Sequence, residues 1–195
     1  MKKLLFITAI LLGLLPASIA SAHDPIILTS EQQTPADGPL LVDGTISFAI
    51  RAAFNKTGEK KAFRAQFKEG EALEIQYLIL DKKPENALKN TLLPQLVVTS
   101  PSGKSLTIKF TERTKFYEPY GKTNYLYLSR YSAAAEAGTY SFTLTARARS
   151  SVTIAVGERE VPGEVIRGMR PSATPTPTTV AATPTASAKP TATPS

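Results

Sequence analysis

Residues Glu136 to Ala146, EAGTYSFTLTA, hold the clearest strand of the sequence together with the turn that leads into it. Tyr140, Phe142 and Leu144 alternate there with hydroxyl-bearing residues, which is the period of a strand with one face in a core and the other in water. Gly138 permits a sharp entry that a residue with a Cβ would resist. An aromatic residue just after such a turn is typical of the corner of a Greek-key sandwich, where a Tyr hydroxyl bonds to nearby backbone. We therefore expect Tyr140 to close a corner of this kind.

The two ends of the 195-residue chain differ in composition from its middle. Residues 1–22 contain two lysines, then an apolar run, then small residues, which is the order of a secretory signal peptide cleaved before His23. The alternative is an uncleaved membrane anchor, but the run is short for a span and Pro16 interrupts it. Residues 171–195 are almost wholly Pro, Thr, Ala and Ser, which cannot bury apolar surface, so we expect a disordered tail or stalk. The sequence thus predicts one secreted or cell-envelope domain without a membrane span after cleavage.

Short segments with the period of strands recur through the middle of the chain. Eight are expected, at residues 46–50, 62–67, 73–80, 96–99, 106–110, 125–131, 140–145 and 152–156. Residues 23–44 contain three prolines and no sustained period, so we expect an irregular arm that lays only residues 26–28 on the domain. Many short strands at this spacing predict an all-β fold, an antiparallel β-sandwich or jelly roll, over residues 45–170.

Two short turns predict hairpins. Glu69-Gly70-Glu71 is a polar turn, and we expect it to pair the strands at 62–67 and 73–80. Ser100-Pro101-Ser102-Gly103 has Pro at the second place and Gly at the fourth, which suits a type I turn between 96–99 and 106–110.

Two of the expected strands are apolar on both faces. The first ends in Tyr77-Leu78-Ile79-Leu80, so another part of the chain must cover its outer face, and we expect residues 81–94 to do so as a helical turn or packed loop. The second is Tyr125 to Tyr131, in which Leu126 and Leu128 are expected to point one way. Its three tyrosines, Tyr125, Tyr127 and Tyr131, are expected to point the other way.

The layout of residues 62–80, 96–106 and 125–156, with AGTYSFTLT in the last segment, resembles the bacterial pre-peptidase C-terminal domain. That family is a β-sandwich appended to secreted peptidases and other exported proteins, so the resemblance implies an accessory or binding role. Family members usually carry an acidic segment before the second hairpin turn, and related collagen-binding members use such acids for calcium. This chain has Leu93, Pro94 and Gln95 at that place, so the resemblance does not carry a calcium site over.

Several classes of chemistry are excluded by composition. The chain has no cysteine and one histidine, His23, so a Cys-His pair is absent and the base of a Ser-His-Asp triad would lie at the mature N-terminus. A terminal His can chelate copper, but that site needs a further imidazole, so we expect no metal and no cofactor. The formal net charge is +7, or about +5 without Lys2 and Lys3. No run of five or six basic residues is present, so a nucleic acid is not an expected partner.

The remaining candidate site is the aromatic and basic segment from Arg113 to Tyr131. The residues expected to contact a ligand are Tyr117, Tyr120, Lys122 and Tyr127. Tyr suits a binding surface because it combines a rigid apolar ring with a polar tip, and sugar rings stack on such rings. The structural alternative, which applies to Tyr127 in particular, is a ring that only packs between sheet and loop.

These patterns favour a secreted or envelope-associated, non-catalytic binding or adhesion module, displayed on a Pro/Thr-rich stalk. Its ligand is expected to be a carbohydrate, a cell-envelope polymer or a protein. The alternative is a small secreted hydrolase or a copper-dependent enzyme that uses His23. A third reading is a purely structural component of the envelope.

Overall fold

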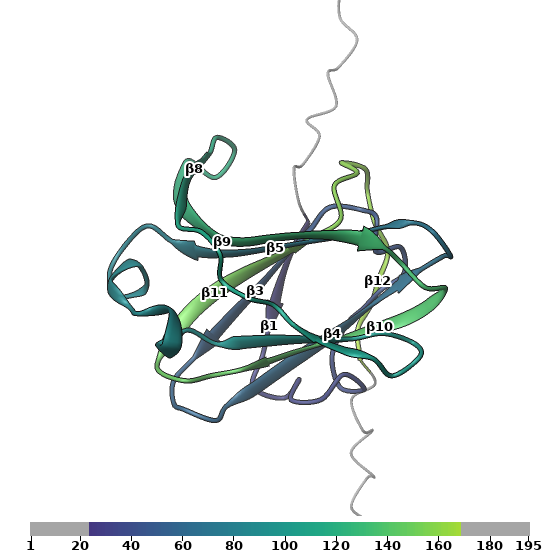
Figure 1. Ribbon diagram of the computed structural model, residues 1–195, viewed down its shortest axis with the longest axis horizontal. Helices are drawn as coiled ribbons and strands as arrows, with labels where there is room; N and C mark the ends of the chain where they lie inside the picture. The colour runs from purple at the N-terminus through teal and green to yellow at the C-terminus, as the bar shows by residue number, and fades with distance from the viewer. Residues whose placement is uncertain (1–23, 169–195) are drawn as a thin grey trace, which may run out of the picture.

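The computed structural model describes residues 24–168, which form two six-stranded sheets (Figure 1). The expected signal peptide, His23 and the expected tail at 171–195 lie outside the described residues. Sheet A has the strand order β1 (Asp24–Leu28), β3 (Phe48–Phe54), β11 (Ser150–Val156), β5 (Ala72–Leu80), β9 (Thr123–Ala134) and β8 (Thr114–Glu118). Sheet B has the order β12 (Val165–Ile166), β2 (Leu40–Leu41), β4 (Lys60–Phe67), β10 (Gly138–Thr145), β6 (Gln95–Thr99) and β7 (Ser105–Thr107).

The predicted all-β sandwich is confirmed, with its core between the inner faces of the two sheets. The alternating apolar residues of β3, β4, β10 and β11 meet there, and many of them are fully buried. Phe63 and Phe142 stack with their ring centroids 4.5 Å apart and an interplanar angle of 9°. Burial of apolar side chains from both sheets stabilises the fold without any disulfide.

Tyr140 closes the corner that the sequence predicts. Its hydroxyl oxygen accepts a hydrogen bond from the Glu136 backbone N–H at 2.8 Å. Its ring is 5% exposed and meets Phe67 edge to face, with centroids 5.5 Å apart. Gly138 has φ 130°, and a Cβ there would lie 2.9 Å from Pro101, so a larger residue would be strained.

Only one of the two predicted hairpins is present. β6 and β7 pair as expected. The Gly103 N–H donates a hydrogen bond to the Ser100 carbonyl at 2.9 Å, which closes the turn between them. The predicted pairing of β4 with β5 is wrong, because β4 belongs to sheet B and β5 to sheet A. The turn at Gly70 instead crosses between the sheets, and the Gly70 N–H donates to the Ala135 carbonyl at 2.9 Å in the neighbouring β9–β10 crossover.

The N-terminal arm is a structural part of both sheets. β1 pairs in parallel with β3, and β2 pairs in parallel with β4, so the sheets are mixed and not purely antiparallel. Leu28 and Leu41 are buried in the core. The expectation of an irregular arm is therefore wrong at β1 and β2. Pro25 obscured the first strand in the sequence, yet β1 is an edge strand, where a residue without an N–H is tolerated.

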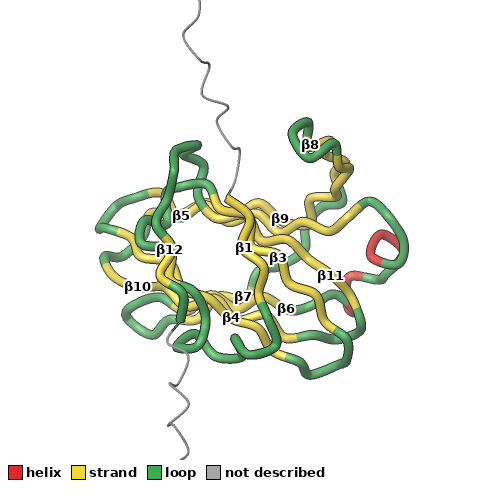
Figure 2. Tube along the Cα trace, turned by 180° about the vertical axis from the view of Figure 1, so that it is seen from behind, coloured by secondary structure: helices red, strands yellow, loops and turns green. Residues whose placement is uncertain are grey.

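Residues 81–94 do not cover the outer face of β5, contrary to the prediction. They form two short 3₁₀ helices, Glu85–Ala87 and Asn90–Leu92, at one end of the sandwich (Figure 2). Leu93 is buried in the main core, and the Tyr77 hydroxyl donates to the Pro94 carbonyl at 2.8 Å. The outer face of β5 is covered instead by aromatic residues of β8 and β9, which pack against Leu78.

Tyr131 points to the opposite face from the one predicted. Tyr77 pairs with Ser129 while Leu78 pairs with Tyr127, so β9 has one extra residue, Leu128, at this point. Such a β-bulge shifts the alternation of side chains by one position. Tyr131 therefore packs partly against the main core, whereas Tyr125 and Tyr127 lie on the outer face.

Candidate functional site

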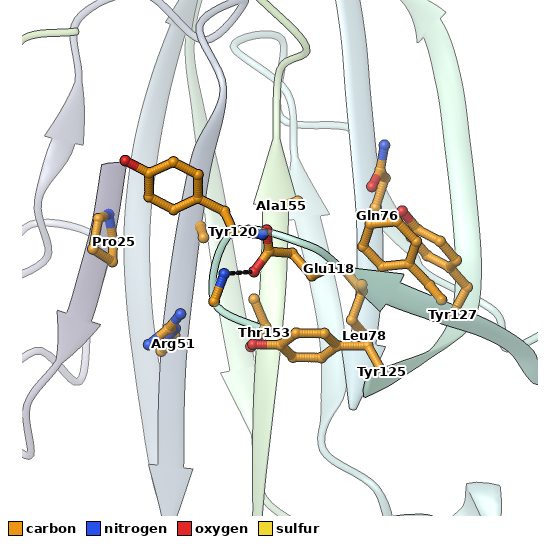
Figure 3. A pocket seen from close by; sticks show the side chains of 13 residues that line it. Pro25, Arg51, Gln76, Leu78, Glu118, Tyr120, Tyr125, Tyr127, Thr153 and Ala155 are labelled. Carbon is orange, nitrogen blue, oxygen red and sulfur yellow. Dashed lines mark hydrogen bonds between the residues drawn. The ribbon is translucent and has the colours of Figure 1, made fainter. Parts of the chain in front are cut away.

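The outer face of sheet A carries an elongated hollow, which we call the trough. Figure 3 shows the side chains that line the part of the trough beside β8 and β9. Its floor is made by small side chains of the neighbouring strands β3 and β11, namely Ala49, Ala53, Ser151, Thr153 and Ala155. Ala49 pairs with Ala155 and Ala53 pairs with Ser151. Paired residues lie on the same face of a sheet, so these small side chains produce a depression across both strands.

The walls of the trough come from the two edges of sheet A. On one side β1 contributes Pro25 and Ile27. On the other side stands the β8–β9 hairpin, which projects from the sheet in Figure 1. The hairpin supplies four aromatic residues, Phe116, Tyr120, Tyr125 and Tyr127. The trough is thus a channel with a flat floor, an aromatic wall and an aliphatic wall.

The tip of the hairpin is held in place by Glu118. Its carboxylate accepts hydrogen bonds from the backbone N–H groups of Tyr120 at 2.7 Å and Gly121 at 2.6 Å. A Cβ at Gly121 would lie 2.7 Å from the same carboxylate, so a larger residue there would displace the end of the Glu118 side chain. In Figure 3 the Tyr120 ring extends from this turn toward Pro25 of β1. Glu118 therefore positions the Tyr120 ring over the floor of the trough.

The base of the hairpin is held by an ion pair. The Arg130 guanidinium donates two hydrogen bonds to the Glu112 carboxylate, at 2.9 and 2.8 Å, and this contact holds the pKa of Glu112 below its usual range. Arg130 also lies 5.0 Å from the centroid of the Tyr127 ring, and Phe116 packs on that ring at 5.0 Å. Burial raises the pKa of the Tyr127 hydroxyl. The aromatic wall is therefore fixed before any ligand arrives.

Arg51 is the one cationic side chain among the residues that line the trough. It projects from the middle of β3, directly beside Thr153 of β11. Its guanidinium has no hydrogen bond or ion pair to any residue within the described range 24–168, and it is exposed. An exposed cation without a partner, at the centre of a hollow, is available to a ligand.

Two of the four residues predicted to contact a ligand line the trough, Tyr120 and Tyr127. Tyr117 is 55% exposed but alternates with Phe116 and Glu118 along β8, so it faces the other side of the hairpin. Lys122 occupies the hairpin turn with φ 51° and does not line the trough.

Sequence reasoning missed Arg51 and the floor. A signal was present, because the polar-face positions of β3 and β11 hold mostly Ala and Ser in place of the large charged residues usual on a solvated sheet. The sequence did not reveal that these two strands are neighbours.

The residues that line the trough include one carboxylate and no histidine or cysteine. Glu118 is the one carboxylate lining the trough, and its oxygens are occupied by turn amides. Among residues 24–168, no group of three or more His, Cys, Asp or Glu side chains is placed to hold a metal ion. Within the same range, no helix has the length and hydropathy needed to cross a membrane.

No protein-family model matches the chain, and no curated protein is detectably similar to it.

Proposed function

We propose that this protein is a secreted or envelope-associated, non-catalytic binding module that holds an extended ligand in the trough. The continuity of the trough carries the proposal. Two adjoining hollows, of about 180 and about 240 Å³, share Arg51, Tyr125 and Thr153. A hollow that continues along the strands suits one linear molecule better than a compact one.

The chemistry of the lining supports the same proposal. The four aromatic side chains of the hairpin offer a rigid apolar surface, so they lose little conformational entropy when a ligand binds. Gln76, Thr153 and the tyrosine hydroxyls add polar groups that orient a ligand. The resemblance of the strand layout to pre-peptidase C-terminal domains, and the order of residues 1–22, agree with an exported accessory domain.

Affinity gel electrophoresis tests the proposal. It measures binding of the protein to a panel of soluble polysaccharides and cell-envelope polymers. Tyr120→Ala should abolish retardation of the protein by the polymer that it binds, because the ring over the trough is lost. Tyr117→Ala is the matched control: both rings are 55% exposed on the same hairpin, but Tyr117 faces away from the trough. The control should keep its retardation within about twofold, as expected of a surface change away from the site.

Two results would overturn the proposed function. The first is release of shortened polymer or new reducing ends by the wild type, which would make the protein an enzyme. The second is equal loss of binding in Tyr120→Ala and Tyr117→Ala, which would place the ligand elsewhere on the molecule.

A further inference from the structure

We propose that the ligand of the trough is an acidic polysaccharide, whose sugar rings pack on the aromatic wall while a ring carboxylate binds Arg51. This inference rests on the proposed function and specifies its ligand. The side-chain cluster that carries it is Arg51, Tyr120, Tyr125 and Tyr127 around the shared part of the two hollows.

Charge complementarity is the first argument. Arg51 and Glu118 are the two charged side chains that line the trough. The negative charge of Glu118 is stabilised by two backbone N–H groups of its own turn. The guanidinium of Arg51 has no such partner within residues 24–168. A planar guanidinium binds a carboxylate through two parallel hydrogen bonds, so Arg51 is suited to bind a carboxylate over the floor of the trough.

The backbone of the floor favours a sugar over a peptide. β3 lies between β1 and β11, and β11 lies between β3 and β5, so both floor strands are paired on both sides. Over residues 48–52 of β3 and 153–156 of β11, which pair on both sides, the N–H and C=O groups are committed to the sheet and are not available to the main chain of an extended peptide that binds by strand addition. Recognition must therefore proceed through side chains. A sugar ring suits this because it has an apolar C–H face for an aromatic ring and a hydroxyl or carboxylate edge for polar groups.

The dimensions of the trough favour a polymer. The hollow near Phe116 and Gln76 continues past Arg51 to a second hollow near Leu80 and Ile27. Successive sugar units can thus lie on either side of the Arg51 guanidinium, with the hairpin rings along one edge.

Isothermal titration and affinity electrophoresis at 0.15 M salt should compare polygalacturonate and alginate with the neutral polymer dextran, on the full mature chain. We expect the acidic polymers to bind at least about tenfold more tightly than dextran. Arg51→Gln should weaken binding of the acidic polymers by about 10- to 100-fold, the range of a charge-assisted hydrogen-bonded pair. Arg51→Lys should recover part of the lost affinity, because a lysine keeps the positive charge but cannot form the bidentate hydrogen bonds of a guanidinium.

Lys115→Gln is the matched control for charge. Lys115 is exposed on β8 and its side chain lies on the opposite face from Phe116, so this variant removes the same charge without touching the trough. The affinity of Lys115→Gln for the acidic polymers should stay within about twofold of that of the wild type. Dextran sulfate is the control polymer, because it carries charge without carboxylates. Circular dichroism and urea unfolding of each variant check that all are folded.

Each result separates this inference from the proposed function. If dextran binds as tightly as the acidic polymers, or if only Tyr120→Ala weakens binding, the proposed function as a binding module is still supported. The inference that its ligand is acidic is then wrong. If Arg51→Gln and Lys115→Gln weaken binding equally, or if dextran sulfate binds as well as polygalacturonate, the contact is a general charge effect and the carboxylate-specific inference is wrong, while the comparison of Tyr120→Ala with Tyr117→Ala still decides the proposed function. Failure of the wild type to bind either acidic polymer also overturns the inference.

Discussion

Tyrosine occupies three different environments in this chain, and its surroundings decide what it does. Tyr77 is fully buried and donates to the Pro94 carbonyl, and burial raises the pKa of its hydroxyl well above the ordinary value. Tyr140 is buried at a corner, where its hydroxyl accepts from backbone. Tyr120 is half exposed over the trough. The first two rings stabilise the fold, and the third is free to contact a ligand.

Substitutions at Tyr140 test the corner. Tyr140→Phe leaves the Glu136 N–H without its acceptor, which should lower the free energy of unfolding by about 1 to 3 kcal/mol. Tyr140→Ala also leaves a cavity beside Phe67 and should lower it by about 3 to 5 kcal/mol. Urea denaturation measures both. Tyr120→Ala is the control and should change stability by less than about 0.5 kcal/mol; a loss as large as that of Tyr140→Ala would mean that the trough wall is part of the core.

At the scale of the element, the β8–β9 hairpin is the part of the fold that forms the site. It extends past the edge of the sandwich, so its own contacts must hold it (Figure 1). Glu118 orders its tip and the Glu112–Arg130 pair orders its base. Arg113 adds hydrogen bonds to the Asn86 and Leu88 carbonyls, which connect the hairpin to the 3₁₀ segment. A projecting hairpin is thus made rigid by local polar contacts.

The Glu112–Arg130 pair predicts a pH-dependent contribution to stability. The pKa of Glu112 is lower in the folded protein than its ordinary value, because Arg130 donates to the carboxylate. A lowered pKa contributes stability above the unfolded pKa of about 4.3, and this contribution is lost as pH falls through the folded pKa. Glu112→Gln should therefore reduce the urea midpoint slightly at pH 7, and its difference from the wild type should become smaller at pH 3, as the carboxylate begins to be protonated in the folded protein too.

A second carboxylate serves as the control for that prediction. Glu164 is exposed, and its side chain makes no hydrogen bond or ion pair to residues 24–168. Glu164→Gln should leave the difference between the pH 7 and pH 3 midpoints as it is in the wild type. An equal effect of the two substitutions would show that net charge, and not the Arg130 contact, controls the acid response.

At the scale of the whole molecule, the N-terminal arm completes the sandwich. β1 covers the edge of β3 and sends Leu28 into the core, while Pro25 and Ile27 form a wall of the trough. The Lys61 ammonium of sheet B donates to the Leu28 carbonyl at 2.9 Å, which ties the two sheets together at this edge. Burial lowers the pKa of Lys61. The same segment therefore supports both the fold and the site.

Neighbouring residues of β1 test this double role. Leu28 is 2% exposed, so Leu28→Ala should lower the free energy of unfolding by about 2 to 5 kcal/mol. Ile27 is 71% exposed, so Ile27→Ala should change stability by less than about 0.5 kcal/mol while it removes a wall of the trough. Thermal or urea unfolding distinguishes them. A small effect of Leu28→Ala would mean that β1 is only loosely attached to β3.

Two features that depend on residues close in sequence were predicted correctly. The period of Tyr140, Phe142 and Leu144 set which face of β10 is buried, and the turn at Ser100 to Gly103 set the β6–β7 hairpin. Both depend on steric and hydrogen-bonding preferences within a few residues, so the sequence by itself determined them.

Pairings between distant segments were decided only by the tertiary structure. A polar turn such as that at Gly70 serves a hairpin or a crossover between sheets equally well, and the partners of β4 and β5 settle which it is. The bulge at Leu128 turned Tyr131 inward, a change that no alternation pattern anticipates. The trough has the same origin, because the floor residues of β3, with Arg51 among them, lie about a hundred positions in sequence from the floor residues of β11. Outside bulges, the period of the sequence determines which face of its strand a residue takes, because side chains alternate along an extended backbone, but long-range strand pairing determines which residues share that face.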